Sequence, residues 1–81
     1  MNEPIIRIDL HGMRRDEAQV VIDHALSMIN SGTYQIRLIH GFNRGVSLRD
    51  MIIYEYRDHP DVIRIAPGEN RGITNLIIRE L

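Results

Sequence analysis

The sequence predicts a two-layer α/β sandwich in which four strands form a mixed sheet and two helices cover one of its faces. Three observations predict this fold. Short apolar segments alternate with two longer segments whose apolar residues recur every three or four positions. Each longer segment follows a His-Gly pair, and a turn rich in proline and glycine joins the last two short segments. The predicted order of elements is therefore βαβαββ.

The first strand is predicted over residues 5–10, where apolar and polar residues alternate. Gly12 lets the chain turn into the first helix. The apolar stripe of this helix recurs at three- and four-residue steps and consists of Ala18, Val21, Ile22, Ala25, Leu26 and Ile29. We expect the helix to end at Ser31 and Gly32, with Gly32 as a left-handed cap.

The second strand is predicted over residues 35–40 and the second helix over about residues 46–58, where Pro60 prevents its continuation. A third strand is expected over residues 62–66 and a fourth over residues 73–79. Two helical connections predict parallel pairing of the first strands, whereas the last turn predicts an antiparallel return.

Length and composition limit the class of protein. The 81 residues allow one domain, 1–81, with residues 1–4 as an N-terminal tail. The absence of cysteine excludes a disulfide, a thiolate nucleophile and a cysteine-type zinc site. The chain start lacks the pattern of a signal peptide, and no apolar run approaches the roughly 18 residues of a membrane span. We therefore expect a soluble, cytoplasmic protein with no membrane partner.

The kind of charge is more informative than the net charge. A net charge of −1 argues against indiscriminate binding of polyanions. All ten basic residues are nevertheless arginine, the side chain best suited to bidentate phosphate contacts. Compositional bias is the alternative explanation.

If both helices cover one face of the sheet, strand alternation places arginine on the other face. The strands supply Arg7, Arg37, Arg64 and Arg79, and the loops add Arg14, Arg15, Arg44 and Arg71. Acidic residues lie mostly on the predicted helices, so this arginine face suits a phosphate backbone. The alternative explanation for these arginines is that exposed strands need charge for solubility and for protection of the sheet edges. Phe42 and Tyr34 are the nearest aromatic residues that could stack on bases, so base-specific recognition is expected to be weak.

Two similar loops follow the first two strands. Residues 10–15 and 39–44 both read apolar-His-Gly-apolar-x-Arg. Each lies where a parallel strand ends and a helix begins, which is the usual position of a site on an open α/β sheet and one that favours anions. We expect the two loops to share one site.

These motifs resemble the Smr, or small MutS-related, domain. The segments that carry the resemblance are IDLHGMRRDEA, IHG, SLRDMI, HPDV, IAP and RGITNLII, and they cover nearly the whole chain. The resemblance implies a two-layer α/β sandwich that binds RNA or DNA. For several members it implies endonuclease activity on DNA or on ribosome-associated RNA, so the ribosome is a further candidate partner.

The resemblance also implies site residues. The Asp-x-His pair implicated in cleavage in this family corresponds to Asp9 and His11. The glycine-rich loop of the family, His-Gly-x-Gly-x-Gly, is one residue longer here and lacks the middle glycine. We therefore expect Asn43 or Arg44 to contact phosphate through its side chain. The last glycine motif is reduced to residues 70–72, which is typical of a divergent branch.

Phosphodiester hydrolysis needs a base, an acid and stabilisation of the phosphoryl charge. His11 could be the base or the acid, with Asp9 orienting it or binding a divalent ion such as magnesium or manganese. His40 could be a second proton carrier, and Arg14, Arg15 or Arg44 could hold the phosphate. The alternatives are a turn-stabilising His11 and a buried, structural His40. Two functions remain open: an endonuclease, and a non-catalytic nucleic-acid- or ribosome-binding adaptor.

Overall fold

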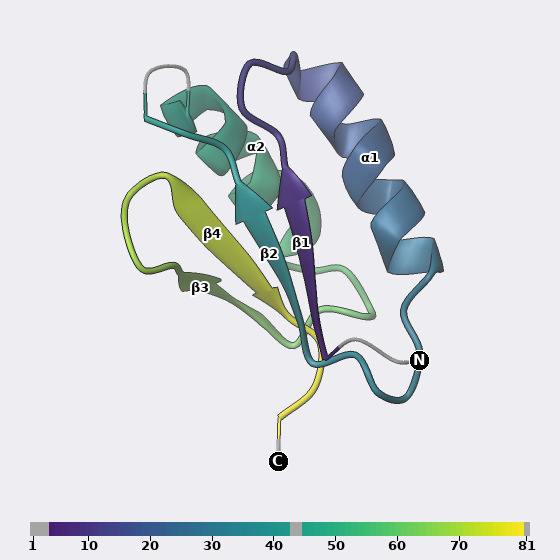
Figure 1. The fold of residues 1–81 in the computed structure, drawn as a ribbon. Helices are drawn as coiled ribbons and strands as arrows, with labels where there is room; N and C mark the ends of the chain where they lie inside the picture. The colour runs from purple at the N-terminus through teal and green to yellow at the C-terminus, as the bar shows by residue number, and fades with distance from the viewer. Residues whose placement is uncertain (1–3, 43–44, 81) are drawn as a thin grey trace.

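The computed structural model describes residues 4–42 and 45–80. The elements in these residues are β1 (Ile5–Asp9), α1 (Arg15–Ser27), β2 (Gln35–Ile39), α2 (Gly45–Tyr56), β3 (Arg64–Pro67) and β4 (Ile73–Ile77). Both helices pack on one face of the sheet and leave the other face open (Figure 1). The predicted fold class and the βαβαββ order are confirmed.

The sheet has the strand order β1-β2-β4-β3. β1 and β2 are parallel, and β4 lies antiparallel to both of its neighbours. Both helical connections step across the sheet in the same direction. Because such connections are right-handed, they place both helices on the same face. The predicted parallel and antiparallel pairings are confirmed.

The hydrophobic core lies between the helices and the covered face of the sheet. The strands contribute Ile36, Leu38 and Leu76, all fully buried, and α1 and α2 contribute residues from one side of each helix: Ala18, Ile22, Ala25, Leu26, Leu48, Met51, Ile52 and Tyr56. The Tyr56 hydroxyl donates a hydrogen bond of 2.7 Å to Asp23 Oδ1 and so links α2 to α1.

The end of α1 differs from the prediction. The helix ends at Ser27, and Met28 caps it in a right-handed conformation with its N–H bonded to the Ala25 carbonyl. Gly32 does not adopt the predicted left-handed conformation. Asn30 makes the turn instead, because its side-chain oxygen accepts a hydrogen bond of 2.8 Å from the Gly32 N–H.

Neither helix in the described part of the chain has the length and apolar character needed to cross a membrane.

Candidate nucleic-acid site

The two His-Gly loops lie side by side at one edge of the sheet. Asp9 and Ile39 pair at the carboxyl ends of the parallel strands β1 and β2. Gly12 and Gly41 each turn the chain with a positive φ, +79° and +81°, which only glycine adopts freely. A Cβ atom built on Gly41 would lie 3.4 Å from the His11 Cβ. The two loops are therefore in contact.

Asp9 holds the His11 ring. Asp9 Oδ1 accepts one hydrogen bond of 2.6 Å from His11 Nδ1 and another of 3.1 Å from the His11 backbone N–H. Both bonds lower the pKa of the Asp9 carboxyl from its usual value, and the bond from the His11 ring has the larger effect. An ionised carboxylate only accepts hydrogen bonds, so the ring proton lies on Nδ1. Nε2 is therefore the nitrogen left for an external partner.

Both side chains of this pair face solvent. The exposed fraction is 72% for the His11 side chain and 58% for that of Asp9. Within the described residues the His11 ring hydrogen-bonds Asp9 and no backbone group. This geometry differs from that of a histidine whose ring stabilises a turn by bonding the backbone, the alternative considered from the sequence.

His40 lies in a different environment although its motif is the same. The residue is 2% exposed, and its ring bonds the Gly41 carbonyl through Nδ1 and the Thr74 hydroxyl through Nε2, at 3.1 Å and 2.8 Å. Burial lowers the pKa of His40, and the positive charge of Arg49 acts in the same direction, against the opposing effect of the Gly41 carbonyl. Both ring nitrogens thus have protein partners, which favours the structural role for His40 over proton transfer.

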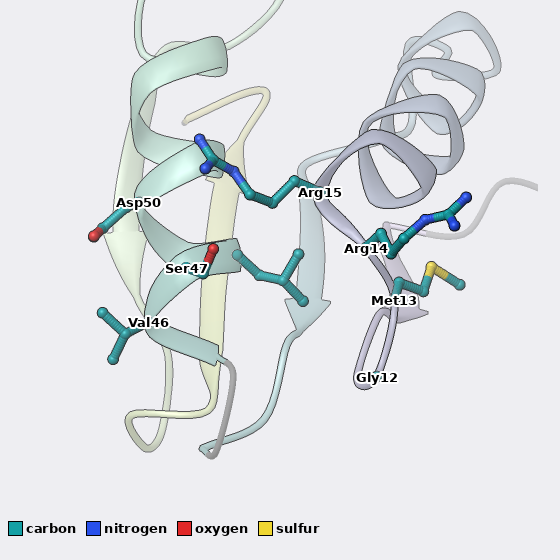
Figure 2. A pocket seen from close by; sticks show the side chains of 8 residues that line it. Gly12, Met13, Arg14, Arg15, Val46, Ser47 and Asp50 are labelled. Atoms are coloured by element: carbon teal, nitrogen blue, oxygen red, sulfur yellow. The ribbon is translucent and has the colours of Figure 1, made fainter.

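An open hollow separates the start of α1 from the start of α2. It has a volume of about 740 Å³ and is lined by residues that include Gly12, Arg15 and Ser47. Figure 2 shows Arg15 extending toward α2, whereas Arg14 points away from it. Arg14 also pairs with Glu17 at 3.4 Å. Of the two arginines predicted here, Arg15 is the one available in the hollow.

A row of polar residues crosses the middle of the open face. Arg7 on β1 pairs directly with Arg37 on β2, which pairs with Asn75 on β4. Arg37 Nη2 lies 3.9 Å from Glu69 Oε1, and Arg37 Nε and Asn75 Oδ1 have no hydrogen-bond partner among the described residues. Like charges on directly opposed residues repel each other. An anion at this row would relieve that repulsion.

The open face is less polar than the arginine pattern suggests. By strand alternation the face also carries four isoleucines, each buried or half-buried: Ile5, Ile39, Ile73 and Ile77. The same alternation that placed the arginines on this face already placed these isoleucines there.

Two predicted arginines lie far from the His-Gly loops. Arg64 forms an ion pair with Glu80. These two residues line a hollow of about 490 Å³ together with Tyr34 and Arg79. Arg64 pairs with Ile77 on β4, which pairs with the first residue of β2, which in turn pairs with the first residue of β1. Arg64 therefore lies level with the start of β1, whereas His11 follows the end of β1. The structure therefore does not bring Arg64 and Arg79 to the His11 end of the sheet.

Arg71 does lie at that end. It belongs to the turn between β3 and β4, and the next residue, Gly72, accepts hydrogen bonds from the backbone N–H groups of His40 and Gly41 at 2.9 and 3.0 Å. The turn is thereby fastened to the loop that contacts His11. Within residues 4–42 and 45–80, Arg71 forms no ion pair.

Two predicted site residues lie outside the described part of the chain, and two residues that support the site were not identified from the sequence. Asn43 and Arg44 lie outside the described residues, so their contact with phosphate stays a prediction. The sequence did not identify Thr74, and it marked Gly72 only as part of the last glycine motif, because both lie more than 30 residues from the His40 loop that they hold.

The described residues contain no group of three or more histidine, aspartate or glutamate side chains placed to hold a metal ion. At the His-Gly loops, a divalent ion would meet Asp9, whose Oδ1 already accepts two hydrogen bonds. The donor set that is visible here does not by itself form a metal centre.

Comparison with families of known proteins matches residues 8–75 to the Smr domain. The chain belongs to the Smr domain family. Its structure is similar to a crystal structure of the Smr domain of Thermus thermophilus MutS2, with a TM-score of 0.81 and 29% sequence identity over 93% of this chain and 99% of that one. Comparison with curated proteins finds no match. The Smr family is associated with nucleic-acid binding and nuclease activity, and the resemblance seen in the sequence is confirmed.

Proposed function

We propose that this Smr domain binds RNA or DNA and cleaves phosphodiester bonds in it, with His11 as the residue that transfers the proton. The hydrogen bond between Asp9 Oδ1 and His11 Nδ1 is the observation that supports this function most directly. It fixes the tautomer and the orientation of the ring, as the aspartate does in the Asp-His pairs of hydrolases.

The chemistry follows from the free nitrogen. His11 Nε2 accepts the proton of the attacking oxygen, which is a water or, in RNA, the neighbouring 2′-hydroxyl. As this oxygen bonds to phosphorus, the bond from phosphorus to the leaving oxygen breaks. The imidazolium is stabilised by the Asp9 carboxylate and returns the proton to the leaving oxygen. Arg15 and Arg71, at the same end of the sheet, are the candidates to neutralise charge on the non-bridging oxygens.

Binding of the chain of phosphates is assigned to the open face. Arg7 and Arg37 lie on the same side of the sheet as Asp9, whose carboxylate holds the His11 ring, because residues two apart on a strand share a face. A nucleic acid bound across this row would pass from the two arginines to the His11 ring. His40 supports the site from the buried side of the loop, because its ring hydrogen-bonds the Thr74 hydroxyl on β4.

A second candidate function is a non-catalytic adaptor that binds nucleic acid or the ribosome. The burial of His40 favours it, because no second histidine with an exposed ring is then available at the His-Gly loops in the described part of the chain.

The test follows binding and cleavage together. Labelled single- and double-stranded RNA and DNA are incubated with the wild type, with His11→Ala and with His24→Ala, each with and without magnesium or manganese. His24 is an exposed histidine on α1 and serves as the matched control. Cleavage that is lost only in His11→Ala, with binding kept, supports the endonuclease. Salt-sensitive binding without cleavage by any form supports the adaptor, and absence of binding refutes both.

A further inference from the structure

Phe42 is an exposed aromatic residue next to the proposed cleavage site. It is the single phenylalanine of a chain that has no tryptophan, yet 64% of it is exposed. It directly follows Gly41, which lies beside His11. The most readily buried aromatic side chain in this sequence is thus left in solvent at the His11 end of the sheet.

One edge of the Phe42 ring lies close to the Gly72 backbone. A Cβ atom built on Gly72 would lie 3.3 Å from Phe42 Cε2 and 3.3 Å from Gly41 Cα. Gly72 is itself buried, and its carbonyl accepts the hydrogen bonds of the His40 and Gly41 N–H groups. One edge of the ring therefore rests on a glycine backbone that a larger residue would obstruct. The ring stays close to the loop that contacts His11.

An exposed aromatic ring beside the proposed cleavage site has one evident ligand. Nucleobases stack on such rings irrespective of sequence, because every base has a π-face. A base within a duplex is already covered by its neighbours on both faces, so it is not available for stacking. Arg71 precedes Gly72 in the turn between β3 and β4, so it is a candidate to contact a phosphate of the bound strand.

We propose that Phe42 stacks on an unpaired nucleobase beside the phosphate that His11 cleaves, and that the protein thereby selects single-stranded over double-stranded nucleic acid. This inference rests on the proposed function, since it assigns the substrate class of the same site. It concerns binding as well as cleavage, so the two can be tested separately.

The experiment compares Phe42→Ala, Phe42→Trp and Tyr54→Ala with the wild type. Tyr54 on α2 is a matched control, because it is an aromatic residue with 72% exposure on the helical side of the molecule. The probes are a single-stranded oligonucleotide, the corresponding duplex, and single strands with one abasic position scanned along the sequence. Circular dichroism verifies that each variant is folded.

We expect Phe42→Ala to bind the single strand about tenfold more weakly than the wild type and the duplex equally well. Phe42→Trp should bind the single strand at least as tightly as the wild type, because its ring is larger, and Tyr54→Ala should bind it as the wild type does. One abasic position should weaken binding to the wild type by a similar factor and have no effect on Phe42→Ala, because the base and the ring then act as one interaction.

Two results overturn the inference: equal loss of affinity for single strand and duplex, or wild-type affinity in Phe42→Ala. If the wild type cleaves nucleic acid and Phe42→Ala cleaves single strands as well as the wild type does, the stacking role fails while the proposed function stands. If the wild type binds single strands through Phe42 without cleaving them, the endonuclease fails while the stacking role stands.

Discussion

Replacing Asp9 by asparagine isolates the charge of the Asp9–His11 pair from its shape. Asparagine has the same size, and its side-chain oxygen can still accept the hydrogen bond from the His11 backbone N–H. The turn after β1 is therefore retained. The substitution removes the negative charge that stabilises the imidazolium and that fixes the proton on Nδ1.

The expected size of the effect follows from the exposure of the pair. General acid–base catalysis by a positioned side chain contributes about 10²- to 10⁴-fold, which limits the loss in His11→Ala. In a buried triad the corresponding asparagine variant loses about 10⁴-fold. Here the side chains are 72% and 58% exposed, so water screens the charge and competes for the ring. We expect a loss of roughly tenfold in Asp9→Asn, smaller than that in His11→Ala.

The assay is single-turnover cleavage at saturating protein, measured from pH 5 to 8, with Kd measured in parallel. Because the pKa of Asp9 lies below its usual value, the carboxylate stays charged over this whole range. Titration of Asp9 itself should therefore not change the ratio of wild-type to variant rates between pH 5 and 8. Asp16→Asn is the control, since Asp16 is an exposed carboxylate at the start of α1 that pairs with Arg14 and not with His11.

Two results would refute this role of Asp9. One is a cleavage rate in Asp9→Asn equal to that of the wild type. The other is a loss of equal size in Asp16→Asn, which would indicate a general effect of charge at this end of the molecule rather than an effect on the His11 ring.

Three further predictions concern binding and stability. Arg37→Gln should reduce the slope of log K against log salt concentration for nucleic acid by about 1, whereas Arg57→Gln on the helical side should not change it; equal slopes would remove Arg37 from the interface. The wild type should lose stability as the pH falls through about 6.5, since the unfolded chain then binds a proton that buried His40 does not, with a slope of at most about 1.4 kcal/mol per pH unit. Urea unfolding of His40→Gln should show a smaller slope, and parallel curves would contradict this. Tyr56→Phe removes the hydrogen bond to Asp23 and should lower the free energy of unfolding by about 1 kcal/mol and the Tm by roughly 4–8 °C. The loss is no larger because the exposed Asp23 carboxylate then bonds water instead. An unchanged Tm would show that this bond does not stabilise the packing of the helices.

The fold could be predicted because its signals are local. Alternation over residues 5–9 and a three- and four-residue period in α1 fixed the type of each element, and the two helical connections fixed the parallel pairing. The end of α1 was wrong because Gly32 was the obvious cap, whereas the Asn30 side chain makes the turn. Competition between neighbouring polar side chains decides such ends.

The candidate site could be predicted only where it is local. Asp9 ends β1 and His11 follows two residues later in the turn, so their proximity could be predicted from the sequence. The different environments of His11 and His40 could not, since their motifs are alike. Burial of His40 depends on Thr74, 34 residues away, which reaches it only because β4 inserts beside β2.

The accessibility of the arginines was equally hidden. Arg7 and Arg64 both face outward by alternation, yet Arg64 pairs with Glu80 beyond the end of β4. Such pairs depend on the course of the chain after a strand, which the period of the strand does not specify.

Proton transfer by His11 is tested most directly by chemical rescue. The single-turnover cleavage rate of His11→Ala is measured with and without added imidazole and compared with that of the wild type. We expect the substitution to slow cleavage at least about 100-fold with Kd unchanged, and imidazole to restore part of the rate in proportion to its unprotonated form. A His11→Ala protein that cleaves as fast as the wild type would contradict the assignment of His11 to the chemistry.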